Sequence, residues 1–201
     1  MKEDILEQLV EDYLQFKGFF TIHNVKFKPA ETAPDYLKKH DSVASDIDVV
    51  GLHPLLRGKE HVCVVSCKSW QGGFDPKKRI ELIEKNKRIA GRPAWKSFRE
   101  LVKKKWADGL IAEIRRLTGS EKFTYITAVT LLKGEASVWE TYRPFRKNLR
   151  GNPMRVLSLQ EMLDSLYSKT NTTVAGSEIG RLLQVIKASG WLPKPKPGHR
   201  S

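Results

Sequence analysis

The chain has 201 residues, of which 40% are hydrophobic and 29% are charged, and it carries a formal net charge of +13. This length allows one domain with a sizeable core, and the composition is typical of a globular rather than a disordered protein. The early acidic residues exclude a signal peptide, and no apolar run approaches the roughly 18 residues of a membrane span. The two cysteines, Cys63 and Cys67, predict no disulfide framework. We therefore expect a soluble, cytoplasmic protein that makes no membrane contact.

The first half of the sequence predicts one helix followed by three strands. Apolar residues recur at helical spacing over residues 3–17, and Gly18 then ends the helix. Three later runs are β-branched, aromatic or continuously apolar, as in strands, and they cover residues 19–28, 47–52 and 61–69. The last of these runs is the kind expected at the centre of a buried sheet. Residues 29–45 contain prolines and mixed charges and predict a loop.

The second half predicts more helices and a few further strands. The expected helices are 77–90, 94–117, 158–167 and 174–189, and the expected strands are 123–132, 136–142 and 154–157. This order favours an α/β fold with a central mixed sheet flanked by helices. We expect a core domain over residues 1–168, a small helical element over 169–192 and a disordered basic tail over 193–201.

Charged side chains stand at the ends of two of the expected central strands. Side chains two apart in a strand share a face, so Ser66 and Lys68 point the same way. A lysine at the end of a buried strand needs a negatively charged partner, because burying an unpaired charge costs free energy. Asp46 and Asp48 begin the preceding strand, and a hairpin would bring Asp48 beside Lys68. Glu7 lies on the first helix, near the border of its apolar stripe.

This set of residues suits phosphodiester hydrolysis. Carboxylate oxygens are the hard ligands that Mg²⁺ prefers, and Mn²⁺ commonly substitutes for it. A bound divalent ion polarises the phosphoryl oxygen and helps to form hydroxide. A lysine positions the water and offsets the charge that develops at phosphorus.

The residues quoted above resemble motifs of the PD-(D/E)xK, or restriction-endonuclease-like, nuclease superfamily, and in particular its Holliday-junction-resolvase and Mrr-like branches. Glu7 precedes Gly18-Phe19 by the typical eleven residues, Asp48 opens an apolar strand, and Ser66-Cys67-Lys68 matches the acid-x-Lys motif in part. The resemblance covers residues 3–72. It implies a metal-dependent endonuclease acting on DNA, with Glu7 and Asp48 as metal ligands and Lys68 as a catalytic residue.

The sequence departs from that pattern because Ser66 stands where the family has an acid. Two interpretations remain open. In one, the carboxylate has moved to the following helix, as in family members with a Ser-x-Lys pattern, and Glu81, 13 residues after Lys68, becomes a metal ligand and catalytic residue. In the other, the site is degenerate and the domain only binds nucleic acid. An RNA-directed nuclease is a third hypothesis, and a homodimer that cuts two strands is compatible with this class.

Each candidate residue also has a purely structural interpretation. Glu7 could be a solvated helix acid with Glu11 as its rival, Asp48 a turn cap, and Lys68 a side chain that extends from a strand end to solvent. Asp46, Ser66 and Gln71 are expected to lie next to the catalytic and metal-binding residues and to help position them. A zinc site at His61, Cys63 and Cys67 lacks an evident fourth ligand.

Positive charge is concentrated in the middle of the chain. Residues 75–118 contain 14 Lys and Arg but only 6 Asp and Glu. Because the apolar stripe of the long helix faces the core, its lysines are expected to point outward and contact phosphates without reading sequence. The candidate nucleic-acid-binding residues are Lys77, Lys78, Arg79, Lys103, Lys104 and Lys105.

Overall fold

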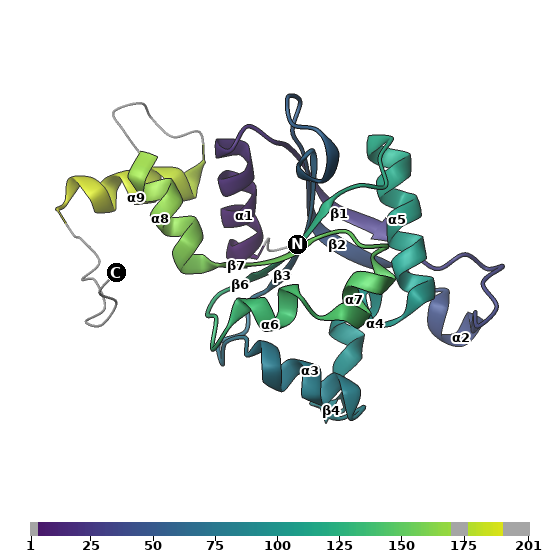
Figure 1. Cartoon of the computed structure of the whole chain (residues 1–201). Coiled ribbons are helices and arrows are strands. Elements are labelled where there is room, and N and C mark those ends of the chain that lie inside the picture. The colour runs from purple at the N-terminus through teal and green to yellow at the C-terminus, as the bar shows by residue number, and fades with distance from the viewer. Residues whose placement is uncertain (1–3, 170–176, 191–201) are drawn as a thin grey trace.

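A computed structural model describes residues 4–169 and 177–190, and it contains a five-stranded mixed sheet (Figure 1). The strand order is β1-β2-β3-β6-β7, in which β1, β2 and β3 are antiparallel and β3, β6 and β7 are parallel. The strands are β1 (Phe20–Phe27), β2 (Ser45–Leu52), β3 (Val62–Lys68), β6 (Thr124–Val129) and β7 (Met154–Ser158). The expected α/β architecture with a mixed central sheet is therefore confirmed.

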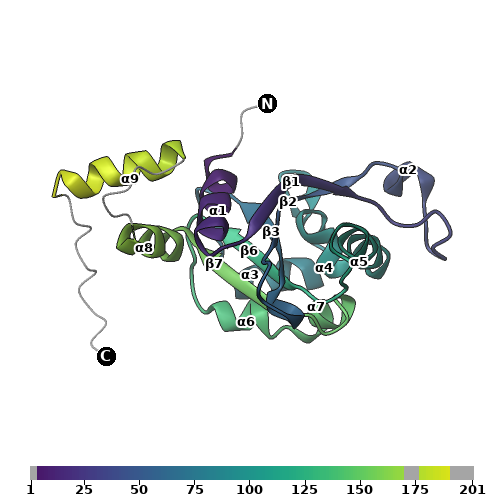
Figure 2. The ribbon, with the colours of Figure 1, turned by 90° about the horizontal axis from the view of Figure 1, so that it is seen from above.

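Helices cover both faces of this sheet, which Figure 2 shows from above. One face carries α1 (Ile5–Phe16) and α8 (Leu159–Lys169), and the other carries α4 (Arg99–Val102) and α5 (Lys104–Thr118). The alternation of β3 explains the two layers, because Cys63 and Val65 pack toward α1 while Val62 and Val64 pack toward α5. All four side chains are buried, as the continuous apolar run predicts.

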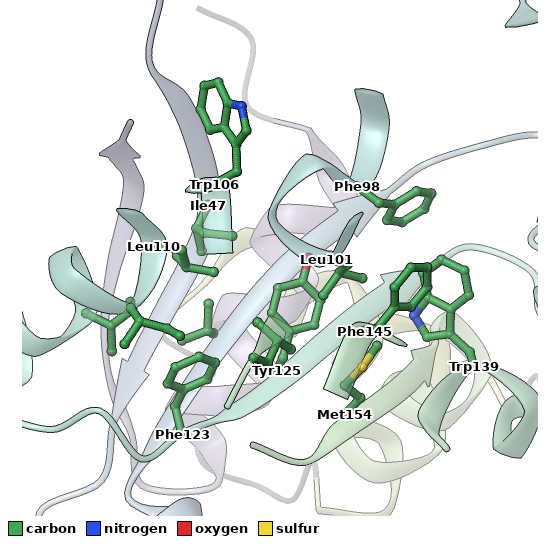
Figure 3. Close-up of a cluster of buried hydrophobic side chains, with 14 of the residues drawn as sticks. Ile47, Phe98, Leu101, Trp106, Leu110, Phe123, Tyr125, Trp139, Phe145 and Met154 are labelled. Atoms are coloured by element: carbon green, nitrogen blue, oxygen red, sulfur yellow. The ribbon is translucent and has the colours of Figure 1, made fainter. Parts of the chain in front are cut away.

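The larger of the two apolar layers is rich in aromatic residues (Figure 3). Trp139 packs among several of these rings, with ring centroids 4.8 Å from Phe98 and 4.9 Å from Phe145. Its indole donates a hydrogen bond to Thr127 Oγ1 at 3.1 Å, which satisfies the only polar atom of the side chain. Trp139 belongs to α6 (Ala136–Glu140), where a strand over 136–142 was expected, and that expectation is wrong. A single buried face of the segment fits a short helix rather than the alternation of a strand.

The helix expected over 77–90 ends early. It appears as α3 (Pro76–Glu84), after which Asn86 adopts a left-handed conformation with φ of 47°. The N–H of Lys87 then donates to the Leu82 carbonyl at 2.9 Å, as in a helix C-terminus that closes with a left-handed residue. The chain continues into a small hairpin of β4 (Arg88–Ile89) and β5 (Arg92–Pro93).

The long helix expected over 94–117 is interrupted. It divides into η2 (Ala94–Phe98), α4 and α5, with Lys103 in extended conformation between the last two. Residues five apart on one helix point about 140° away from each other. The interruption lets both Leu101 and Trp106 face the core, where their exposed fractions are 0% and 2%.

The remaining elements are short or peripheral. They are α2 (Lys38–Asp41), η1 (Gly58–Glu60), α7 (Arg143–Asn148) and α9 (Glu178–Ala188). Leu183 of α9 packs against Leu9 and Leu166, so this helix rests on α1 and α8. The expected tail over 193–201 lies outside the described residues, and the expected domain boundaries stay a prediction. Among the described helices, none is long and apolar enough to cross a bilayer.

Candidate functional site

A cavity of about 380 Å³ opens at the edge of the sheet where β2 begins and β3 ends. It is lined almost entirely by polar and charged side chains from these two strands, the β4–β5 hairpin, η2 and α4. The lining residues are Ser45, Asp46, Asp48, Ser66, Cys67, Lys68, Ser69, Trp70, Arg92, Lys96, Ser97, Arg99 and Glu100.

Asp48 reaches this cavity because β2 and β3 separate beside it. Their backbone pairing stops at Val49 and Val65, and the next N–H of β3 that needs a partner, that of Cys67, donates to Asp48 Oδ2 at 2.5 Å. Burial raises the pKa of Asp48, although the charge of Lys68 and the Cys67 N–H act in the opposite direction. The carboxylate is thus fixed in orientation while it remains a partner for a cation.

Lys68 is the last residue of β3 and lines the same cavity. Its Nζ donates to Ser66 Oγ at 2.7 Å and lies 5.3 Å from the centre of the Phe98 ring. Ser66 is buried, with 3% of its surface exposed. The structure therefore brings Asp48, Ser66 and Lys68 together, and it directs the ammonium group into the cavity wall rather than into open solvent.

Glu7 approaches Asp48 from the opposite side of the strand end. It lies in the first turn of α1, and its pKa is raised first by burial and then by the negative charge of Asp48. Asp4 caps the same helix and accepts a hydrogen bond from Ser69 Oγ, which holds the start of α1 at the end of β3. Glu7 is a neighbour of Asp48 but does not line the cavity.

The rival acid Glu11 is engaged elsewhere. Its Oε1 accepts hydrogen bonds from Gln15 and Thr21. His23 Nε2 also lies 2.9 Å from this oxygen, an ion-pair distance without hydrogen-bond geometry. Of the two acids, Glu7 is the one that interacts with Asp48.

Glu81 does not reach the cavity. Its side chain is 49% exposed on α3 and lies 3.9 Å from Lys85 Nζ. A different acid, Glu100 of α4, is the carboxylate that the structure places at the cavity wall. Glu100 is 4% exposed and accepts a hydrogen bond from the Tyr125 hydroxyl. Burial raises its pKa, and the nearby charge of Lys68 partly opposes this effect.

The other expected supporting residues lie at different depths. Asp46 lines the cavity but also forms an exposed ion pair with Lys26 at 2.7 Å. Gln71 is exposed and stands outside the lining. Across the described ranges, no three His, Cys, Asp or Glu side chains are grouped closely enough to hold a metal by themselves, and Cys63 and Cys67 are free thiols.

The expected phosphate-binding lysines do not all point outward. The expectation that Lys105 points outward is wrong, because its side chain is only 10% exposed and forms an ion pair with Asp41 at 2.8 Å. Lys104 is paired with Asp108 on the surface. Lys77, Lys78 and Lys103 are exposed. Arg79 is not among the cavity-lining residues, but it stacks over the ring of Trp70, which lines the cavity, 4.1 Å from the ring centre.

Comparison of the chain with protein-family models, with curated proteins and with solved structures gives no match. Function is therefore inferred from the residues and the geometry of this edge of the sheet.

Proposed function

We propose that the protein is a metal-dependent endonuclease of the restriction-endonuclease-like class that hydrolyses phosphodiester bonds in DNA. The observation that carries this proposal is the meeting of Asp48 and Lys68 in one polar cavity, with Glu7 beside Asp48. A carboxylate pair and an amine at one strand end suit phosphodiester hydrolysis. The mixed sheet with helices on both faces is compatible with that fold class.

The acids at this edge fit a hard divalent cation. Burial and then the negative charge of Asp48 raise the pKa of Glu7, and a cation bound beside both acids would favour its ionised form. Mg²⁺ requires only one or two protein carboxylates because waters and substrate phosphates complete its octahedron. Asp48 and Glu7 would hold the ion, which supplies charge stabilisation and a more acidic water when bound.

The protein's own groups have distinct tasks in this proposal. The Cys67 N–H holds Asp48 in one orientation, and Ser66 Oγ holds Lys68 Nζ. Lys68 orients the attacking water and stabilises the negative charge that develops on the phosphoryl oxygens. Glu100 lies in the cavity wall near Lys68, and the two charges attract each other.

One observation favours a second candidate, a domain that binds nucleic acid without cutting it. Ser66 occupies the position of the family's acid, and Glu81 does not replace it at the cavity. A site with fewer acids binds metal less tightly. A chain with such a site could bind nucleic acid without hydrolysing it.

Cleavage assays distinguish the two candidates. Purified protein is incubated with plasmid, linear and branched DNA and with RNA, in Mg²⁺, in Mn²⁺ and in EDTA. We expect metal-dependent DNA cleavage that falls by about 10²–10⁴-fold in Asp48→Asn and Lys68→Ala. Glu81→Gln is the matched control and should retain activity, because its carboxylate lies outside the cavity. Binding without cutting under every metal would support the second candidate, and cutting of RNA alone would reassign the substrate.

A further inference from the structure

Four exposed cations line one side of the molecule next to the candidate site, and we call them the cationic ridge: Arg88, Arg92, Lys96 and Lys103. They come from the β4–β5 hairpin, from η2 and from the interruption between α4 and α5. Residues 85–105 contain nine Lys and Arg but a single acid, Glu100, which is buried. Figure 1 shows β4 at the lower edge of the molecule, beyond the end of α3.

The ridge contrasts with those basic surface residues that are paired with acids. Several surface cations outside the ridge sit in ion pairs, such as Lys104–Asp108 and Arg116–Glu113, and Arg150 bridges two acids. No ridge residue has an ion-pair partner within the parts of the chain that the structure describes. Uncompensated like charges at close range produce a local positive field that attracts a polyanion.

The ridge also connects the candidate site with a second cavity. Arg92 and Lys96 line both the cavity that holds Asp48 and Lys68 and a neighbouring one of about 620 Å³. Arg88 and Lys103 line only the second cavity, whose two acids, Asp35 and Asp41, are paired with Lys105. A strand whose phosphate lies at Asp48 therefore meets cations in succession as it leaves the first cavity.

The ridge cations stand on ordered supports. The hairpin turns through Ala90 and Gly91, both with positive φ (48° and 78°), as a two-residue hairpin requires. The Ala94 N–H donates to the Lys87 carbonyl at 2.8 Å and closes the base of the hairpin. Lys103 Nζ lies 5.1 Å from the centre of the Trp95 ring, which restricts its side chain. A side chain that is already restricted, as that of Lys103 is, loses less conformational entropy when it binds a phosphate.

We propose that the cationic ridge binds the sugar-phosphate backbone of the nucleic-acid strand that continues away from the candidate site. The contacts are to phosphates, so they position the strand without reading its sequence. The location of the strand relative to Asp48 rests on the proposed function, whereas the binding itself does not require cleavage.

The test is the salt dependence of nucleic-acid binding, measured in EDTA by the fluorescence anisotropy of a labelled duplex and of a single strand. The ridge variant is Arg88→Ala/Lys96→Ala/Lys103→Ala. The control variant, Arg57→Ala/Lys59→Ala/Lys122→Ala, removes one Arg and two Lys that are also exposed. These three precede β3 and β6, at the opposite edge of the sheet from the strand ends that form the site.

Each phosphate contact on duplex DNA contributes about 0.9 to the slope of log K against log salt. We expect the ridge variant to lose about 2.7 from that slope, so that the wild-type advantage in Kd shrinks about 40-fold between 50 and 200 mM salt. The control variant should keep the wild-type slope, and equal thermal unfolding of all three proteins would exclude misfolding as the cause.

Different failures point to different proposals. Equal slopes in the ridge variant and wild type, equal losses in both variants, or no wild-type binding at all would overturn the ridge. Wild-type binding with the expected ridge effect but no cleavage under any metal would leave the ridge in place and reject the nuclease. Cleavage by wild type, together with a ridge variant whose salt slope equals that of wild type, would support the nuclease and reject the ridge.

Discussion

Glu100 is a buried acid whose proton affinity depends on its burial and on the nearby charge of Lys68. Glu100 is almost completely removed from solvent, and the Tyr125 hydroxyl donates to it. Burial raises the pKa of Glu100 above its ordinary 4.5 even though Lys68 lies close by. The folded protein therefore binds a proton at Glu100 more tightly than the unfolded chain does.

This shift predicts how stability depends on pH. An acid whose pKa is higher in the folded state stabilises the fold fully below its unfolded pKa, and the contribution is lost as pH rises through the folded value. Glu100→Gln cannot ionise, so its free energy of unfolding should rise relative to that of wild type by up to about 1.4 kcal/mol per pH unit between pH ~4.5 and the folded pKa of Glu100, and the difference should stay constant above that pKa. Urea unfolding at several pH values measures the difference. A difference that shrinks with rising pH would mean that the charge of Lys68 lowers the pKa of Glu100 more than burial raises it.

The sequence permits prediction of some site residues but not of others. Asp48 and Lys68 lie on adjacent strands of a local hairpin, so strand alternation and pairing are sufficient to place them together. Glu100 belongs to a four-residue helix whose orientation depends on the interruption at Lys103, and nothing in three consecutive lysines specifies where a helix stops. The one feature of the sequence that points to a buried Glu100 is its place next to Leu101 and two residues after Phe98. Both of these apolar residues are fully buried.

At the scale of elements, a buried ion pair joins α2 to α5. Asp41 is 3% exposed and accepts hydrogen bonds from the Leu37 N–H at 2.8 Å and the Trp106 indole at 3.2 Å. Burial alone would raise the pKa of Asp41, but these hydrogen bonds and the adjacent Lys105 lower it. The carboxylate is thus ionised and depends on its cation.

Two adjacent lysines provide a matched test of this link. Lys105→Ala leaves the charge of Asp41 without its cation and should lower the free energy of unfolding by about 1.5–3 kcal/mol, the range for a hydrogen bond to a charged group. Lys104→Ala removes a lysine that is 78% exposed and pairs with Asp108, so it should cost less than about 1 kcal/mol. Urea unfolding of the two variants compares them directly. Similar losses would show that the Asp41–Lys105 pair does not join the two elements.

The elements themselves divide into those fixed by local pattern and those fixed by tertiary packing. The long periodic helix α1 and the apolar strand β3 appear as predicted, because each has one dominant burial pattern. The segment over 136–142 is short and has one deeply buried residue, Trp139, so its helical form depends on the aromatic cluster around it. Asn86 ends α3 through its left-handed conformation, which its residue type only favours.

At the scale of the whole molecule, α9 is set apart from the candidate site. It contacts α1 and α8 through Leu183 and Ile179, and Ser177 Oγ bonds Asp12 at 2.6 Å. None of these residues lines the cavity of Asp48.

A chain ending at Lys169 should therefore keep the proposed cleavage activity but unfold more easily. Burial of Leu183 and partial burial of Ile179 contribute roughly 2–4 kcal/mol, which the conformational entropy lost in ordering α9 partly offsets. Thermal unfolding together with the cleavage assay measures both quantities. Loss of activity from a truncated chain that remains folded would show that α9 takes part in the site.

The hydrogen bond between Asp4 and Ser69 has a practical consequence for anyone who handles the protein. Ser69 lines the cavity, so the chain enters its first helix at the rim of the candidate catalytic centre. A purification tag fused ahead of Asp4 would emerge there and compete with substrate for access, most of all a histidine tag that captures divalent ions. Enzymatic work is better begun with the tag placed after residue 190, or with an amino-terminal tag removed by proteolysis.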